Sequence, residues 1–343
     1  MSSQVINHTT SKVVGQIKNV AAITYALLGY TSGVALLFAH SWWSNLLGTI
    51  LTAHSLLIAS TLVHEFIHGS IFTSRALNAF WGRVMMHLNG ACYATWQQIT
   101  EHHINHHVHI TDFIPFNYSE YVKNMSPWLR SKIRTLEWMY IPGFEFLIRL
   151  DVITSPFTSS RKRHLRGRTL LILSYRLGLF ALLAYLSWKA FLLYLLAYFL
   201  FVSMMRLVET FHHTFEYTVQ GSPIVKRDRA YEQINTFSNV VSIRHPWLNL
   251  LYLNFGYHNA HHYNMRCPWH ELPQLHKSVF DESSGRYSEK AGNLMSFWEM
   301  IATYHKLRLV RVGSDQGDVY GENGEFSIAN FTGGVGASFL TPP

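Results

Sequence analysis

Hydrophobic positions along this chain are gathered into four long stretches that occur as two pairs. The first pair covers residues 20–39 and 46–63, with a short polar segment between them. The second pair covers residues 169–187 and 190–208, and its two members almost adjoin. Each stretch comes close to the roughly 20 residues that a helix needs to cross the hydrocarbon core of a bilayer. The pattern therefore predicts four transmembrane helices arranged in two hairpins.

The segments outside these stretches differ from them in composition. Residues 79–99 and 136–153 are partly apolar, but polar and charged positions interrupt them, which favours interfacial or core helices over further spans. From residue 313 onward the sequence is polar and glycine-rich, with no helical or strand period. We expect an all-α integral membrane domain over residues 1–312, whose four spans carry a helical cytoplasmic cap, and a flexible tail over residues 313–343.

Charge supports this topology and gives it an orientation. Only 14% of the residues are charged, well below the share in ordinary soluble domains. Lys and Arg are concentrated in the segment between the hairpins, whereas the outer turns offer only Lys189. Because positively charged loops stay on the cytoplasmic side, we expect both termini and the long loops to be cytoplasmic. The net charge of +8 has the same explanation, so we do not expect a nucleic-acid partner.

The candidate chemistry lies in clusters of histidine, of which the first ends the second span. His64 and His68 stand in the string HEFIH, and positions four apart share one face of a helix. The same string fits the HExxH signature of zinc proteases, in which the glutamate, here Glu65, activates water. A protease site uses three protein ligands, whereas this chain has many more histidines at metal-binding spacing. Cys92 and Cys267 are too far apart in sequence to suggest a thiolate site.

Two further clusters share the pattern HxxHH, whose three histidines again lie on one helical face. They consist of His103, His106 and His107, and of His258, His261 and His262. In the earlier of the two, His102 offers a competing HxxxHH spacing, so the first ligand is either His102 or His103. After the fourth span, Glu209 and His213 are four residues apart, and His212 is the alternative to His213. Glu209 is a candidate ligand or a partner of a ligand.

The number of histidines indicates two metal ions. One four-coordinate ion cannot use nine imidazoles, and imidazole-rich sites suit iron, copper, zinc or nickel. The candidate ligands are His64, His68, His103, His106, His107, His213, His258, His261 and His262. A non-enzymatic protein that transports or senses metal is the other class to consider. Transport would require polar ligands within the spans, whereas these histidines stand at the ends of the spans.

The strings HEFIH, HINHH and HNAHH, in this order, resemble the three histidine boxes of the membrane fatty acid desaturase superfamily. The resemblance covers about residues 20–305. It implies a mushroom-shaped four-helix stem, a cap that carries the boxes, two iron ions, molecular oxygen as oxidant, and a separate electron donor such as ferredoxin or cytochrome b5. The string FHHT is similar to the extra histidine site of that family, which favours His213. Related stearoyl-type enzymes have an asparagine where this chain has Glu209.

The resemblance identifies the superfamily more closely than it identifies the substrate. The string EHHINHH also fits a box of the alkane hydroxylases, and carotenoid ketolases and hydroxylases have similar boxes. We expect an oxidoreductase that desaturates a long-chain acyl substrate, either a fatty acyl lipid or an acyl-carrier thioester. Hydroxylation or ketone formation on an acyl chain, an alkane or a carotenoid is the alternative.

Overall fold

Four long helices dominate the computed structural model, which describes residues 2–114, 124–215, 217–219, 221–280 and 294–311. These helices are α1 (Ser2–Leu37), α2 (Trp42–His68), α8 (Arg166–Leu186) and α9 (Trp188–Thr210). All four are apolar enough to cross a membrane, which confirms the expected number of long apolar helices. All four begin before the predicted stretches, and α2 continues without a break through the HEFIH string to His68. The expected tail, residues 313–343, lies outside the described residues.

The first hairpin is held by small residues and by one asparagine. A side chain on Gly48 would begin 2.8 Å from the carbonyl oxygen of Gly33, so glycine at this crossing lets α1 and α2 approach closely. Asn45, near the start of α2, donates from its side-chain amide to the carbonyls of Leu36, Leu37 and Ala39. These bonds engage carbonyls at and just after the end of α1, and they close the turn between the helices.

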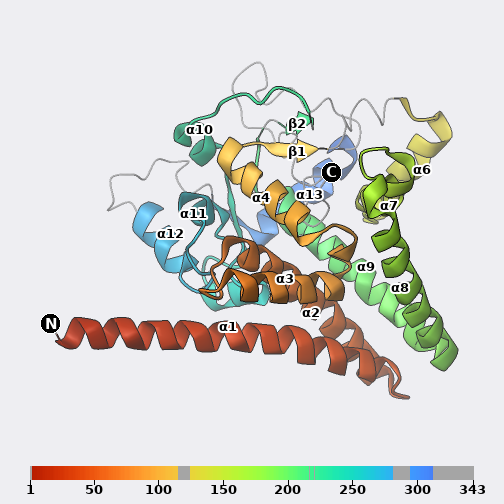
Figure 1. The fold of residues 1–343 in the computed structure, drawn as a ribbon, viewed down its shortest axis with the longest axis horizontal. Coiled ribbons are helices and arrows are strands. Elements are labelled where there is room, and N and C mark those ends of the chain that lie inside the picture. Colours follow the sequence, from red (N-terminus) through yellow and green to blue (C-terminus); the bar gives the residue numbers. More distant parts are fainter. Residues whose placement is uncertain (1, 115–123, 216, 220, 281–293, 312–343) are drawn as a thin grey trace.

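The second helical hairpin contacts the first. In the tight turn, the Ser187 hydroxyl accepts a hydrogen bond from the Ala190 amide and caps α9. The hydroxyl groups of Tyr30 on α1 and Tyr194 on α9 lie 3.0 Å apart. Figure 1 shows α8 and α9 side by side, away from the N-terminal end of α1. Of the four long helices α2 is the most buried and α8 the most exposed, so α2 is the central one of the four.

Shorter elements make up most of the rest of the described structure (Figure 1). The helices are α3 (Arg75–Asn89), α4 (Trp96–His109), α6 (Pro127–Trp138), α7 (Gly143–Thr158), α10 (Arg229–Ile234), α11 (His258–Tyr263), α12 (Leu272–Phe280) and α13 (Phe297–Arg311). The 3-10 helices are η1 (Ala91–Tyr93), η2 (Arg163–Leu165) and η3 (Pro246–Tyr252). In the regions predicted as interfacial or core helices, the structure has α3, η1 and the start of α4, and α7 with the end of α6.

Short strands depart from the all-α expectation. β1 (Asp112–Ile114) pairs in parallel with β2 (Tyr217–Val219), and β3 (Ser238–Val240) pairs in parallel with β4 (Leu294–Ser296). Each strand has three residues and pairs with a segment far away in sequence, so no alternating hydrophobic pattern announces it. The protein is mostly helical, and these strands fasten the loops next to the histidine clusters.

A buried ion-pair cluster fastens α9 to the same region. Arg206 lies 2.6 Å from a carboxylate oxygen of Glu137 on α6 and 3.0 Å from one of Glu145 on α7. Its guanidinium also faces the ring of Tyr304 on α13, 5.3 Å from the centroid. Arg206 and Glu137 are buried, so one arginine of the fourth span joins three other helices.

Candidate metal centre

Five histidines form the first group of converging ring nitrogens. Each of these side chains offers one nitrogen atom, and the five atoms lie within 4.8 Å of one another. The group consists of His64, His68, His103, His107 and His261. Helix α2 supplies two members, α4 supplies two and α11 supplies one. Residues nearly 200 positions apart therefore meet at the end of the second span.

Four other histidines form a second group with the same spacing. Their ligand atoms also lie within 4.8 Å of one another, and all four side chains are buried. The group consists of His106, His213, His258 and His262. The ring centroids of His107 in the first group and His262 in the second lie only 4.2 Å apart, so the two groups are neighbours.

Helical spacing explains how each HxxHH cluster divides its histidines. In α4, His103 and His107 are four residues apart and both belong to the first group, whereas His106 belongs to the second. In α11 the four-residue pair, His258 and His262, belongs to the second group, and His261 belongs to the first. Positions four apart lie above one another on a helix, and the third histidine is rotated away from them. Both helices thereby contribute to both groups.

The spacing of the ring nitrogens fits bound metal ions. Imidazole nitrogens that bind one ion at about 2.1 Å lie roughly 3 Å apart when neighbouring bonds make a right angle. The Nε2 atoms of His68 and His103 are 2.8 Å apart, and His107 Nε2 is 3.2 Å from His103 Nε2. In the second group, His213 Nε2 and His258 Nε2 are 2.8 Å apart. Several such pairs in two adjacent groups are the geometry expected for two histidine-ligated ions.

Three carboxylate groups lie close to the Nδ1 atoms of candidate ligands. Nδ1 of His64 lies 3.1 Å from Glu65, and Nδ1 of His106 lies 3.0 Å from Asp112. Nδ1 of His262 lies 2.9 Å from Glu232, which also forms a third candidate group with His107 and His262. A carboxylate that accepts the Nδ1 proton fixes the tautomer and leaves Nε2 for a metal. Sequence reasoning considered Glu65 only as a protease base and missed Asp112 and Glu232.

Burial keeps the imidazoles in the form that binds metal. It lowers the pKa of His258, His261 and His262 well below the ordinary histidine value, and neighbouring histidines lower each pKa further. These rings are therefore neutral at physiological pH, as metal ligands must be. Nε2 of His262 is buried and has no hydrogen-bond partner among the described residues. An orphaned nitrogen of this kind is costly unless it binds an ion.

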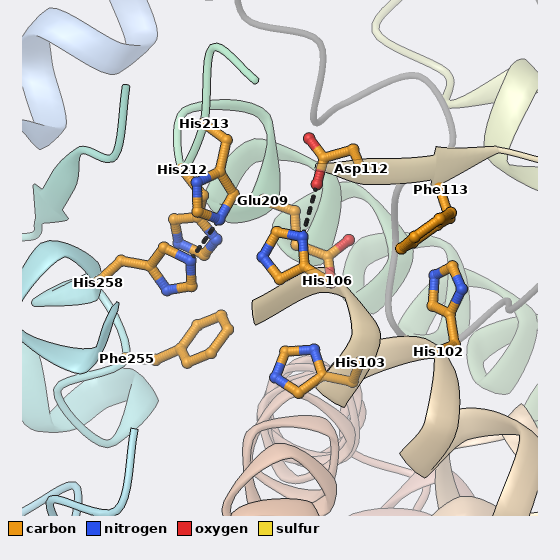
Figure 2. Close-up of a pocket in the computed structure, with 10 residues that line it drawn as sticks. All are labelled: His102, His103, His106, Asp112, Phe113, Glu209, His212, His213, Phe255 and His258. Atoms are coloured by element: carbon orange, nitrogen blue, oxygen red, sulfur yellow. Dashed lines mark hydrogen bonds and ion pairs between the residues drawn. The ribbon is translucent and has the colours of Figure 1, made fainter. Parts of the chain in front are cut away.

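The alternative candidates lie beside the two groups. His102, His212 and Glu209 line a small cavity together with members of both groups, but none of them belongs to a converging set (Figure 2). The ring of His212 stacks on that of His258 at 3.9 Å between centroids. Burial lowers the pKa of both His102 and His212 to about 3.

The reason for expecting Glu209 and His213 on one helical face is wrong. α9 ends at Thr210, so the four-residue spacing does not apply to His213. Instead, His213 forms an antiparallel bridge with Thr236, whose hydroxyl lies 3.4 Å from its Nδ1. This long-range pairing turns the imidazole toward His258 (Figure 2).

The cavity itself has a volume of about 40 Å³ and is bordered by both polar and aromatic side chains. Figure 2 shows His103 and His106 on one side of it and His213 and His258 on the other, with Phe255 between them. A water molecule needs roughly 10 to 15 Å³ of such volume, so the cavity has room for about three molecules of that size. Its size suits a small reactant at the side of the histidine groups.

The family model described as "Fatty acid desaturase" matches residues 40–290, which is most of the chain. The matched range contains α2, α8 and α9, three of the four long apolar helices, and all nine converging histidines. A search of curated proteins found no match.

Proposed function

Because the chain belongs to the fatty acid desaturase family, we propose that it desaturates a long-chain acyl substrate with molecular oxygen at two histidine-bound iron ions. The observation that carries the proposal is the pair of adjacent histidine groups, whose nitrogens have the spacing of metal ligands. Membership of this family implies a membrane oxidoreductase with a lipid substrate.

The two groups provide enough ligands for two iron ions, five histidines for one and four for the other. When bound, the ions supply the activation of oxygen. In the overall reaction the acyl chain loses two hydrogens, the donor supplies two electrons, the aqueous medium supplies two protons, and one oxygen molecule becomes two water molecules. The donor we propose is a separate ferredoxin or cytochrome b5, which docks on the side of the membrane where the histidines lie.

The protein's own side chains orient and isolate the site. Asp112 and Glu232 hold His106 and His262 in the tautomer that presents Nε2 to the ions. Eight of the nine candidate ligands are buried and His68 is half-buried, which keeps bulk water from the reacting methylene groups. α2 and α9 both end at the histidines, on the side of the membrane that holds the Lys- and Arg-rich segment. We propose that this side, with both termini, is cytoplasmic.

Two observations favour desaturation over the other candidates. His102, which the alkane hydroxylase spacing would require, lies outside the converging groups, whereas His103 of the desaturase spacing lies within one. For a zinc protease, Glu65 would have to act on a metal-bound water. Its carboxylate instead accepts hydrogen bonds from the Ser70 hydroxyl at 2.6 Å and the Trp269 amide at 3.3 Å. Glu65 therefore supports the fold around His64.

The test is expression in a host with a ferredoxin system, followed by mass spectrometry of acyl lipids, acyl carriers and carotenoids. We expect an acyl product lighter by two hydrogens, and no such product from the His261→Ala variant. A product that gains oxygen would replace desaturation by hydroxylation or ketone formation. Purified protein that holds zinc or copper and no iron would contradict the proposal as a whole.

A further inference from the structure

A second pocket lies between α3, η1, α4 and the start of α8, apart from the histidine groups. Its volume is about 460 Å³, which is more than ten times that of the cavity beside the histidines. The lining residues are Arg83, Met86, His87, Cys92, Thr95, Trp96, Gln97 and Arg168. Two of these described lining residues are arginines and none is acidic, so the pocket carries a net positive charge.

The two arginines differ in the hydrogen bonds that their guanidinium groups make. Arg168 donates hydrogen bonds to the carbonyls of Cys92, Tyr93 and Ala94, which fix its position without neutralising its charge. Arg83 is exposed and makes no hydrogen bond or ion pair within the described part of the chain. Its guanidinium is therefore free to take a bidentate anionic partner, which suits a phosphate or a carboxylate.

The start of α4 adds backbone donors to the same pocket. A capping box uses the amide groups of Thr95 and Gln98. It leaves the amides of Trp96 and Gln97 without a hydrogen-bond partner among the described residues, and both residues line the pocket. Free amides and the positive end of the helix dipole favour an anion at this place. The helix terminus and the two arginines thus point to the same kind of ligand independently.

The pocket lies at the membrane boundary on the side of the histidine groups. α8 and α9 form a hairpin, so the start of α8 is level with the end of α9, close to His212 and His213. Arg168 is the third residue of α8, and it is followed by Leu170 and Leu171, which are exposed on this membrane-spanning helix. This is the depth at which lipid head groups meet the hydrocarbon core.

Helix α4 connects the pocket directly with the metal centre. From Trp96 the helix reaches His103 after about 10 Å and His107 after about 16 Å, at a rise of ~1.5 Å per residue. Trp96 itself is fixed against α3, because a side chain on Gly82 would come within 2.0 Å of its ring. A head group in the pocket is therefore held at a defined distance from the histidines, and a long acyl chain covers that distance.

We propose that this pocket binds the phosphate of the acyl substrate's head group, an inference that rests on the proposed function. The phosphate contacts Arg83, Arg168 and the free amides at the start of α4, and the acyl chain runs from there toward the histidine groups. A phospholipid and a phosphorylated acyl thioester carry the same chemistry, and the experiment distinguishes them.

The experiment measures binding to the purified, iron-loaded full chain in a non-ionic detergent by titration calorimetry. The probes are dihexanoyl phosphatidylglycerol, hexanoyl coenzyme A and, as the uncharged comparison, dihexanoylglycerol. We expect Arg83→Gln to bind the preferred phosphate probe about tenfold more weakly, since it loses a charge-assisted hydrogen bond, and Arg83→Glu to bind it still more weakly. Arg75→Gln is the matched control, because Arg75 is exposed on the same helix outside the pocket.

The outcomes test the proposed phosphate site separately from the proposed reaction. Weaker binding of either phosphate probe by the Arg83 variants than by the parent protein supports the proposed phosphate site. The phosphate probe that binds more tightly then identifies the head group. Equal binding of all probes by the parent protein and both Arg83 variants would overturn it, even if the preparation carries iron and desaturates lipids. A preparation without iron or product would instead refute the proposed function, whatever the phosphate probes show.

Discussion

The carboxylate of Glu232 lies 2.9 Å from Nδ1 of His262, and both side chains are buried. The glutamate comes from the short helix α10 and the histidine from α11, so the contact joins two elements that are 30 residues apart in sequence. Arg229 binds the other oxygen of the same carboxylate. A carboxylate at this nitrogen leaves Nε2 of His262 available to a metal ion.

Replacing Glu232 by glutamine should therefore weaken the metal centre without removing any of the nine histidines. Loss of such a partner commonly costs about 10- to 100-fold in metal affinity or activity. We expect Glu232→Gln to lose iron on dialysis against a weak chelator that leaves the parent protein loaded, as measured by atomic emission. Glu271→Gln is the control, because Glu271 is exposed and lies outside the histidine groups. Equal iron retention by the two variants would remove Glu232 from the site.

The adjacent histidines after α9 allow a paired test. His213 belongs to the second group, whereas His212 only stacks on His258. We expect His213→Ala to lower the iron content from about two ions per chain toward about one, because the second group loses one of its four histidine ligands and binds its ion more weakly. His212→Ala should keep the iron and lose at most part of the activity. Reversed iron contents in the two purified variants would exchange their roles.

A second pair on α4 tests the first ligand of the middle cluster. His103 Nε2 lies 2.8 Å from His68 Nε2, while the ring of His102 faces Phe113. We expect His103→Ala to abolish turnover and to reduce iron binding by the first group, and His102→Ala to retain at least about a tenth of the parent activity. Iron loss from His102→Ala alone would favour the HxxxHH spacing.

Arg206 should matter for stability through its two buried partners. Removing it leaves the carboxylates of Glu137 and Glu145 close together without their cation. Breaking a buried ion pair on one side costs about 3 to 5 kcal/mol. We expect Arg206→Met to melt several degrees below the parent in detergent, while Arg75→Met melts within about a degree of it. A triple variant that also carries Glu137→Gln and Glu145→Gln should recover part of the loss. An unchanged melting temperature for Arg206→Met would show that the cluster contributes little.

The sequence predicted the helical stem well because its signal is local. The four apolar stretches need only their own length and composition to be recognised, and the four long helices confirm them. Helical spacing also explains how His64 pairs with His68, since both stand on one helix that continues from the span. The ends of the helices were harder to predict, because the apolar stretch and the hydrogen-bonded helix do not end at the same residue: α2 runs past its stretch to His68, whereas α1 stops short at Leu37.

The remaining features depend on contacts between distant segments, which have no local pattern. Glu232 stands in a polar stretch about 30 residues before His262, and nothing near it in the sequence marks it as the partner of a ligand. His213 is oriented by its bridge to Thr236 and not by helical spacing. The three-residue strands that pair around the histidines are likewise too short to give a period.

Removal of the metal should destabilise the chain, and this effect tests the centre apart from catalysis. Without ions, buried nitrogens such as His262 Nε2 have no hydrogen-bond partner among the described residues, and that state is costly. Ions that bind only the folded state stabilise it by about 2.7 kcal/mol when present at a hundred times their dissociation constant.

We therefore expect exhaustive chelation to lower the melting temperature of the detergent-solubilised protein by roughly 5 to 10 °C. Added Fe²⁺ should restore both the melting temperature and turnover, whereas Zn²⁺ should restore the melting temperature alone, because it has no redox chemistry. The His261→Ala variant should respond less to chelation, since its first group has already lost a ligand. A melting temperature that is the same with and without metal would mean that the nine histidines do not form a metal centre.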